Sequence, residues 1–139
     1  MAFSIELQVR DYELDQYGVV NNSVYLGYLE HARHEFLRGL GIDGAEVARA
    51  GRALTLSEIH VRFRDSLRSR DRFTVSVTIA EVGGARVTFG QAIHKEGDPK
   101  PALEATAVAV FLDERGRPQR VAGELRERFL RQMRPGADG

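Results

Sequence analysis

The chain lacks cysteine altogether, and it also lacks an excess of charge of either sign and any long apolar run. The absence of cysteine excludes disulfides, thiol nucleophiles and thiolate metal sites. The histidines are His31, His34, His60 and His94. None of them belongs to a pattern typical of metal ligands, so we expect a protein that works without a metal or a redox cofactor.

The charged residues are balanced, with 20 Lys and Arg against 20 Asp and Glu. Such a chain has no net field that would attract nucleic acid or an anionic membrane, so we expect a small molecule or a protein as its partner. The first residues do not form a basic region followed by a long apolar stretch, and no later segment is apolar enough to span a bilayer. We therefore expect a cytoplasmic protein that binds neither nucleic acid nor a membrane.

At 139 residues the chain has the size of one domain, and we expect residues 1–139 to share one core. Alternating apolar and polar side chains predict a strand over residues 3–10. Apolar residues at helical spacing predict a long helix from Asn22 to about Leu40. The other expected elements are a short helix over 43–50, strands over about 53–64, 72–82, 85–95 and 102–113, a helix over 124–133 and a frayed tail over 135–139.

One strand, one long helix and then four strands predict an α+β fold in which a curved antiparallel sheet wraps around the helix. Gly83-Gly84 predicts a tight hairpin, and we expect strands that are neighbours in sequence to pair. A single helix cannot cover both faces of such a sheet, so two copies pairing through an edge strand would complete it. We expect a homodimer at least, assembled into a tetramer as a dimer of dimers.

Asp15 is the residue whose setting most strongly suggests catalysis. It lies in a turn-like stretch closed by Gly18. The polar residues that follow it and open the long helix are Asn21, Asn22 and Ser23. Free N–H groups at a helix start stabilise the oxyanion formed when a carbonyl is attacked, and a nearby carboxylate acts as nucleophile or as base toward water. The structural alternative is that Asp15 only hydrogen-bonds its own turn.

The stretch from Val9 to Arg33 carries a recognisable pattern. It reads Val9-Arg10-Asp11-Tyr12-Glu13-Leu14-Asp15-Gln16-Tyr17-Gly18-Val19-Val20-Asn21-Asn22, followed by Tyr25 and by Glu30-His31-Ala32-Arg33. This pattern resembles the hotdog-fold acyl-CoA thioesterases of the 4-hydroxybenzoyl-CoA thioesterase type. It is most similar to 1,4-dihydroxy-2-naphthoyl-CoA hydrolases and to plant plastid acyl-carrier-protein thioesterases, and the resemblance covers almost the whole chain in its order of elements.

The resemblance implies specific roles for two residues. The aspartate of the family's Asp-x-x-Gly segment is the catalytic carboxylate, and this role falls on Asp15. The backbone N–H at the start of the long helix binds the thioester oxygen, and this role falls by position on Asn22. The implied reaction is the hydrolysis of an acyl or aroyl thioester of coenzyme A or acyl carrier protein to the free acid and the thiol, without a cofactor.

A weaker resemblance concerns the hotdog thioesterases that release polyketides from enediyne synthases. Those enzymes have an asparagine where this chain has Asp15, and an arginine that matches Arg33. The presence of Asp15 favours ordinary hydrolysis, and it leaves Arg33 as a polar residue of the pocket or a brace for Asp15. The alternative is that Arg33 pairs with Glu30 or Glu35 on a solvated helix face.

Three further residues are weaker candidates for substrate binding. Tyr17 and Tyr25 would line an acyl or aromatic pocket, although aromatic residues beside a helix start are more often part of the core. Glu58 is included because another branch of hotdog thioesterases uses a glutamate in place of the aspartate. With Asp15 present, we expect Glu58 to be secondary.

The densest basic cluster comprises Arg62, Arg64, Arg68, Arg70 and Arg72. Guanidinium groups suit the phosphates of coenzyme A or of a phosphopantetheine arm, and Arg62, Arg64 and Arg68 are the candidates for that contact. The alternative is an ordinary solvated face, since two aspartates interrupt the cluster.

The sequence therefore predicts a hotdog thioesterase that acts through Asp15. A rival interpretation is a hotdog module that binds an acyl thioester without turning it over, because a fold does not fix a function. Another is a thioesterase that releases a polyketide from a carrier protein. A dehydratase of the same fold is disfavoured, since no histidine lies in a matching motif. The acyl group, the choice between coenzyme A and carrier protein, and the choice between nucleophile and base stay open.

Overall fold

The computed structural model describes residues 3–42, 53–121 and 123–133. In chain order the elements are strand β1 (Phe3–Gln8), the 3-10 helix η1 (Asp11–Glu13), helix α1 (Asn22–Gly39), strands β2 (Ala53–Phe63), β3 (Arg72–Val82), β4 (Arg86–Lys95) and β5 (Leu103–Leu112), and helix α3 (Gly123–Met133). The helix expected over 43–50 and the tail expected over 135–139 lie outside the described residues. The other expected elements are confirmed to within two residues at each end.

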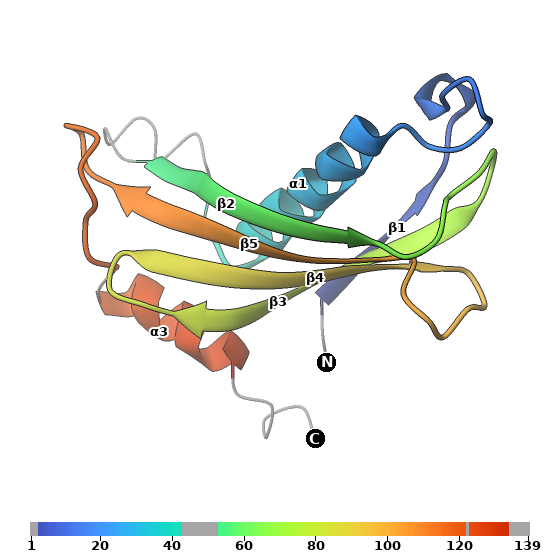
Figure 1. Cartoon of the computed structure of the whole chain (residues 1–139). Coiled ribbons are helices and arrows are strands. Elements are labelled where there is room, and N and C mark those ends of the chain that lie inside the picture. The colour runs from blue at the N-terminus through green and yellow to red at the C-terminus, as the bar shows by residue number, and fades with distance from the viewer. Residues whose placement is uncertain (1–2, 43–52, 122, 134–139) are drawn as a thin grey trace.

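Five strands form one antiparallel sheet in the order β1-β3-β4-β5-β2. The expectation that neighbours in sequence pair is confirmed for β3 with β4 and for β4 with β5. It is wrong for β2 and β3, because β2 crosses the sheet and pairs with β5. This crossover places β2 at one edge of the sheet, and β1 forms the other edge. The five strands together curve around α1 (Figure 1).

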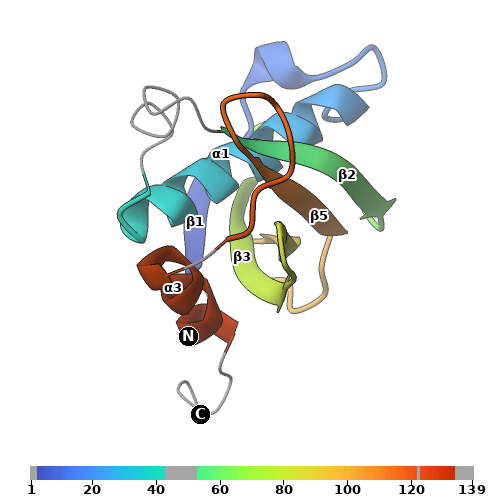
Figure 2. The same ribbon diagram turned by 90° about the vertical axis from the view of Figure 1, so that its left-hand side faces the viewer.

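Helix α1 lies across one face of the sheet (Figure 2) and contributes one side of the core. Its buried apolar side chains recur at helical spacing, at Tyr25, Leu29, Ala32 and Phe36. Phe36 meets Phe89 of β4 edge-on, with ring centroids 6.2 Å apart. Full burial of a side chain such as Leu29 contributes about 1.5–3 kcal/mol, so this face holds α1 against the sheet.

The central strands bury every second side chain, as the alternating sequence predicts. In β4 the buried residues are Val87, Phe89, Gln91 and Ile93. The edge strand β2 differs, because most of its side chains stay exposed in the single chain. Two of these exposed side chains, Leu56 and Phe63, are large and apolar.

Helix α3 packs against β3 and close to the C-terminal end of α1 (Figure 2). Its buried Phe129 fills the contact. Arg128 joins the two helices, since its Nη1 donates to the Leu40 carbonyl at 2.7 Å. A cation at the C-terminal end of a helix is favourable, so α3 stabilises the end of α1 that lies far from Asp15. No helix in the described part of the chain is long and apolar enough to cross a membrane.

Candidate active site

A tight hairpin over residues 14–20 carries Asp15. Leu14 and Val20 pair across it, and the Asp15 N–H donates to the Val19 carbonyl at 2.8 Å. The turn closes where the Gly18 N–H donates to the Asp15 carbonyl at 3.1 Å. Gly18 has a φ of 76°, a conformation that residues with a side chain rarely adopt. The predicted turn is confirmed, and the glycine fixes the path on which Asp15 lies.

The two oxygens of the Asp15 carboxylate have different surroundings. Oδ1 accepts the Tyr17 N–H at 2.8 Å and lies 3.5 Å from the Val19 nitrogen. Oδ2 accepts no hydrogen bond from the residues that the structure describes. The alternative that Asp15 only hydrogen-bonds its own turn therefore holds for Oδ1 alone. The second oxygen, Oδ2, of this half-buried side chain is free to react.

The start of α1 presents an unused backbone donor directly after this hairpin. Asn21 is the N-cap residue, and its Oδ1 accepts the Ser23 N–H at 3.0 Å. The Val24 N–H donates to the Asn21 carbonyl at 2.9 Å. The Asn22 N–H has no hydrogen-bond partner within the described residues. At the positive end of the helix dipole, this free N–H can stabilise a developing negative charge.

Residues 64–71 form hydrogen bonds to the second strand of the hairpin. Val19 pairs with Arg68, and the Val20 N–H donates to the Leu67 carbonyl at 2.9 Å. The Leu67 N–H in turn donates to the Tyr25 hydroxyl at 2.9 Å. The Asp15 turn is thus fastened both to a neighbouring loop and to α1, which limits its movement.

The two candidate tyrosines have different positions. Tyr17 is 77% exposed at the outer end of the hairpin. Tyr25 is buried, its ring meets Phe63 at 5.4 Å, and burial raises the pKa of its hydroxyl. Tyr25 therefore anchors the core and the 64–71 loop, and a substrate contact for either tyrosine stays a prediction.

Arg33 is not on a solvated helix face, so that alternative is wrong. The side chain is only 8% exposed, and its Nη1 donates to the Gln91 Oε1 at 2.9 Å. Gln91 also binds the backbone of α1, because its Nε2 donates to the Leu29 carbonyl at 3.0 Å. Within the described residues no carboxylate forms an ion pair with Arg33, and burial lowers the pKa of its guanidinium. No contact between Arg33 and Asp15 is found there either, so a direct brace between them stays a prediction.

Glu58 lies on the exposed edge strand β2, away from the Asp15 hairpin. A bulge in β2 falls between Leu56 and Glu58. The Glu58 carboxylate lies 3.5 Å from the His60 ring and 4.0 Å from the Arg86 guanidinium. One chain does not bring Glu58 to Asp15, so its part in substrate binding stays a prediction.

The three candidate phosphate ligands are exposed, and one of them is already paired. Arg64 donates from Nε and Nη2 to the Glu104 Oε2, at 3.1 and 2.9 Å. For Arg62 and Arg68 no ion pair is found in the described ranges. Arg62 and Arg68 are therefore freer than Arg64 to bind a phosphate.

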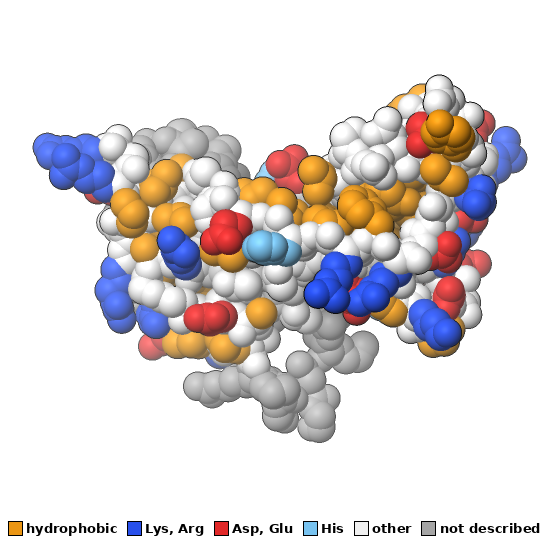
Figure 3. All heavy atoms as spheres, viewed as in Figure 1, with side chains coloured by type: hydrophobic (Ala, Val, Ile, Leu, Met, Phe, Trp, Pro, Cys, Tyr) orange, Lys and Arg blue, Asp and Glu red, His pale blue; other side chains and the backbone are white. Residues whose placement is uncertain are grey.

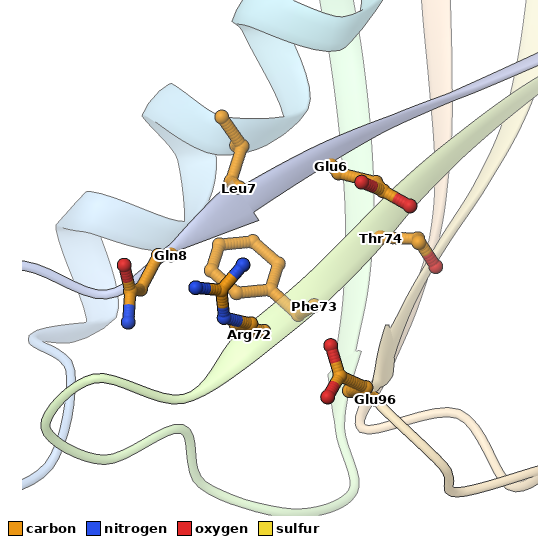
Figure 4. A pocket seen from close by; sticks show the side chains of 7 residues that line it. All are labelled: Glu6, Leu7, Gln8, Arg72, Phe73, Thr74 and Glu96. Atoms are coloured by element: carbon orange, nitrogen blue, oxygen red, sulfur yellow. The ribbon is translucent and has the colours of Figure 1, made fainter.

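Two surface clefts lie outside the Asp15 hairpin. One of about 290 Å³ lies along β1 and β3, and its polar lining comes from Glu6, Gln8, Arg72, Thr74 and Glu96 (Figure 4). The other, of about 430 Å³, is lined by Arg64, Asp65, Asp98, Lys100, Pro101 and Glu104. No group of three side chains that could hold a metal ion occurs in residues 3–42, 53–121 and 123–133. Neither cleft brings the candidate catalytic residues together.

One further residue of this region, Glu13, does not stand out in the sequence. It is a buried carboxylate two residues before Asp15. The only signal in the sequence is one more acidic residue in the mostly charged stretch from Arg10 to Asp15. Such a signal is weak, because exposed acidic residues in loops are common.

Comparison with known proteins assigns the chain to a family. The model of the thioesterase-like superfamily matches residues 9–135. The chain is 48% identical over 130 residues to the chloroplastic acyl-acyl carrier protein thioesterase ATL3 of Arabidopsis thaliana, covering 94% of this chain and 68% of that protein. It is 29% identical over 130 residues to the long-chain acyl-CoA thioesterase FadM of Escherichia coli, covering 92% of this chain and 96% of that one.

The fold is shared with solved structures of the same kind. The crystal structure of Slr0204, a 1,4-dihydroxy-2-naphthoyl-CoA thioesterase from Synechocystis, matches with a TM-score of 0.87 at 19% identity, covering 97% of this chain and all of that one. At this identity the likeness concerns the fold alone. The family match spans the Asp15 hairpin and strands β2 to β5, and it confirms the resemblance seen in the sequence: the chain belongs to the thioesterase-like superfamily and is a hotdog-fold thioester hydrolase.

Proposed function

We propose that the protein hydrolyses an acyl or aroyl thioester of coenzyme A or acyl carrier protein, and that Asp15 carries the chemistry. The observation behind this proposal is that a carboxylate oxygen and a helix N–H without hydrogen-bond partners among the described residues occur in the same short segment. Asp15 Oδ2 and the Asn22 N–H both lack partners within the described residues, and the hairpin that carries Asp15 leads directly into the start of α1.

Asp15 can act in either of two ways. As a nucleophile, Oδ2 attacks the thioester carbonyl, the carbon–sulfur bond breaks, and a mixed anhydride forms that water then hydrolyses. As a general base, Oδ2 takes a proton from a water molecule that attacks the same carbonyl. Both routes give the free acid and the thiol, and in both Oδ1 stays bonded to the Tyr17 N–H.

The Asn22 N–H stabilises the oxyanion on either route. Negative charge grows on the thioester oxygen in the transition state, and a preorganised backbone donor meets that charge without reorganisation. The loss of one such donor typically slows turnover by about 10²–10³-fold. Arg33 and Gln91 contribute a polar site on the inner face of the sheet, next to the apolar face of α1.

The proposed substrates follow from the relatives. ATL3 acts on acyl carrier protein thioesters and FadM on long-chain acyl-CoA. For the carrier's phosphates we propose Arg62 and Arg68, with a smaller part for Arg64 because Glu104 already engages it. Cytoplasmic localisation stays a prediction, and ATL3 is chloroplastic.

We further propose that two copies pair through β2, and that such dimers form a tetramer. Strand β2 is the last in the sheet order, so one of its sides has backbone groups without a strand partner in the described part of the chain. Leu56 and Phe63 of this strand are 42% and 51% exposed. Hydrophobic side chains line the hollow over this part of the molecule, as a second copy would require (Figure 3).

A panel of acyl-CoA, aroyl-CoA and acyl carrier protein thioesters, followed by release of free thiol, tests the proposed activity. We expect one class to be turned over well and the others poorly. Thioester binding without thiol release across the panel would instead support a module that binds but does not hydrolyse. Rapid release of a polyketide from its carrier, with all acyl-CoA and acyl carrier protein substrates inactive, would support the polyketide-releasing alternative.

A further inference from the structure

Glu13 is the only fully buried carboxylate among the described residues, with 7% of the residue exposed. Its Oε1 accepts the Tyr28 hydroxyl at 2.7 Å and the Arg10 N–H at 2.8 Å. Its Oε2 lies 3.5 Å from the Arg10 guanidinium, which is itself largely exposed. Burying a carboxylate is costly unless hydrogen bonds compensate, so the position of Glu13 depends on these partners.

The side chain of Glu13 is fastened to the body of α1. Tyr28 lies in the second turn of α1 and points its hydroxyl at the carboxylate. Burial, followed by the hydrogen bond to Glu13, raises the pKa of Tyr28. The phenol therefore stays protonated at neutral pH and remains a donor to Glu13.

The main chain of Glu13 is fastened to the start of the same helix. Its carbonyl accepts the N–H of Asn21, the N-cap residue, at 3.0 Å. The next residue, Leu14, pairs with Val20 across the hairpin. One residue thus ties the chain that leads to Asp15 both to the N-cap and to the second turn of α1.

We propose that Glu13 is a positioning residue, which fixes the Asp15 carboxylate relative to the Asn22 N–H by binding Tyr28 through its side chain and Asn21 through its carbonyl. The proposal rests on the proposed function of Asp15. Glu13 is buried, and both of its side-chain hydrogen bonds are to other residues of the protein. Its effect comes from geometry, because a displacement of about 1 Å at a reacting group can cost about 10²-fold in rate.

The test compares Glu13→Ala, Glu13→Gln and Tyr28→Phe with Phe129→Leu, a control that loosens α3 away from the Asp15 hairpin. Thermal unfolding measures stability, and thiol release from the best substrate of the panel gives kcat and KM at a temperature where every variant is folded. We expect Glu13→Ala to lower kcat by about tenfold or more with KM within about twofold. Phe129→Leu should lower the unfolding temperature and leave kcat unchanged.

Glutamine provides the rescue that separates geometry from charge. It keeps an oxygen that can accept both the Tyr28 hydroxyl and the Arg10 N–H, so Glu13→Gln should retain kcat within about threefold. Tyr28→Phe should lower kcat less than Glu13→Ala does. Adding it to Glu13→Ala should cause little further loss, because the two side chains act through one bond.

Unchanged kcat in folded Glu13→Ala would overturn the proposal, as would equal losses in Glu13→Ala and Glu13→Gln. If Glu13→Ala does not fold, Tyr28→Phe decides the question: a lower kcat at constant KM supports the proposal, and an unchanged kcat contradicts it. Failure of the proposed function is a separate result. It would appear as an active Asp15→Asn enzyme, whatever the Glu13 variants do.

Discussion

At the scale of single residues, buried polar groups determine the shape of the site more than the exposed charges do. The position of Asp15 in a glycine-closed turn before a helix cap was predictable, because this pattern is visible in the sequence, while its catalytic role stays a prediction. The burial of Glu13 and of Arg33 was not predictable. Burial depends on how the sheet and the 3-10 helix pack against α1, and the partner of Arg33, Gln91, lies far away in sequence.

Tyrosine burial predicts how stability responds to alkaline pH. Because the pKa of Tyr25 and of Tyr28 is raised in the folded state, the unfolded chain loses these protons first as pH rises. The contribution of these two tyrosines to the free energy of unfolding should therefore be constant below pH ~10, the ordinary tyrosine pKa, and fall above it. Urea unfolding between pH 8 and 11 measures this slope.

Tyr28→Phe should reduce that slope by up to about 1.4 kcal/mol per pH unit. The matched control is Tyr12→Phe, since Tyr12 is exposed and should not contribute. An unchanged slope in Tyr28→Phe would show that the buried hydroxyl is not linked to alkaline unfolding.

At the scale of elements, the hairpin over residues 14–20 and the start of α1 form one unit. The sequence predicts both, because turn residues and capping residues act locally. The sequence does not predict that residues 64–71 bind the hairpin, since their position depends on the crossover from β2 to β3. For the same reason the expected pairing of β2 with β3 was wrong.

Two glycines in this unit predict opposite effects of an added methyl group. Gly18 has a positive φ, so Gly18→Ala should destabilise the protein by about 1–2 kcal/mol and lower thiol release by displacing Asp15. Gly27 is helical, and an added Cβ meets no atom within 4 Å, so Gly27→Ala should stabilise by about 0.5–1 kcal/mol. Urea unfolding of both variants checks the signs. Equal effects of the two substitutions would argue against a conformational role for Gly18.

At the scale of the whole molecule, the curved sheet covers α1 on one side, and β2 has a strand neighbour, β5, on one of its two sides only. The α+β architecture was predictable from the order of one strand, one helix and four strands. The edge position of β2 was not, because pairing order depends on contacts between distant segments. This edge, with Leu56 and Phe63 exposed, is where we expect the second copy.

Replacing Leu56 by lysine should weaken the assembly, because a charge would then lie against the partner's apolar edge. Light scattering coupled to gel filtration should give a dimer or tetramer for the original chain and a smaller species for Leu56→Lys. Thr78→Lys places the same charge at an exposed position of β3 and should leave the mass unchanged. A purely monomeric original chain would refute pairing through β2.

The central claim is that Asp15 carries the hydrolysis of a thioester, and Asp15→Asn tests it most directly. Asparagine keeps the oxygen that accepts the Tyr17 N–H, so the turn should survive, while the reactive Oδ2 is replaced by an amide nitrogen. The decisive measurement is kcat for thiol release from the best substrate, with thermal unfolding as the check of folding. We expect a loss of about a hundredfold or more with the unfolding temperature unchanged. Near-normal turnover by the folded variant would contradict it.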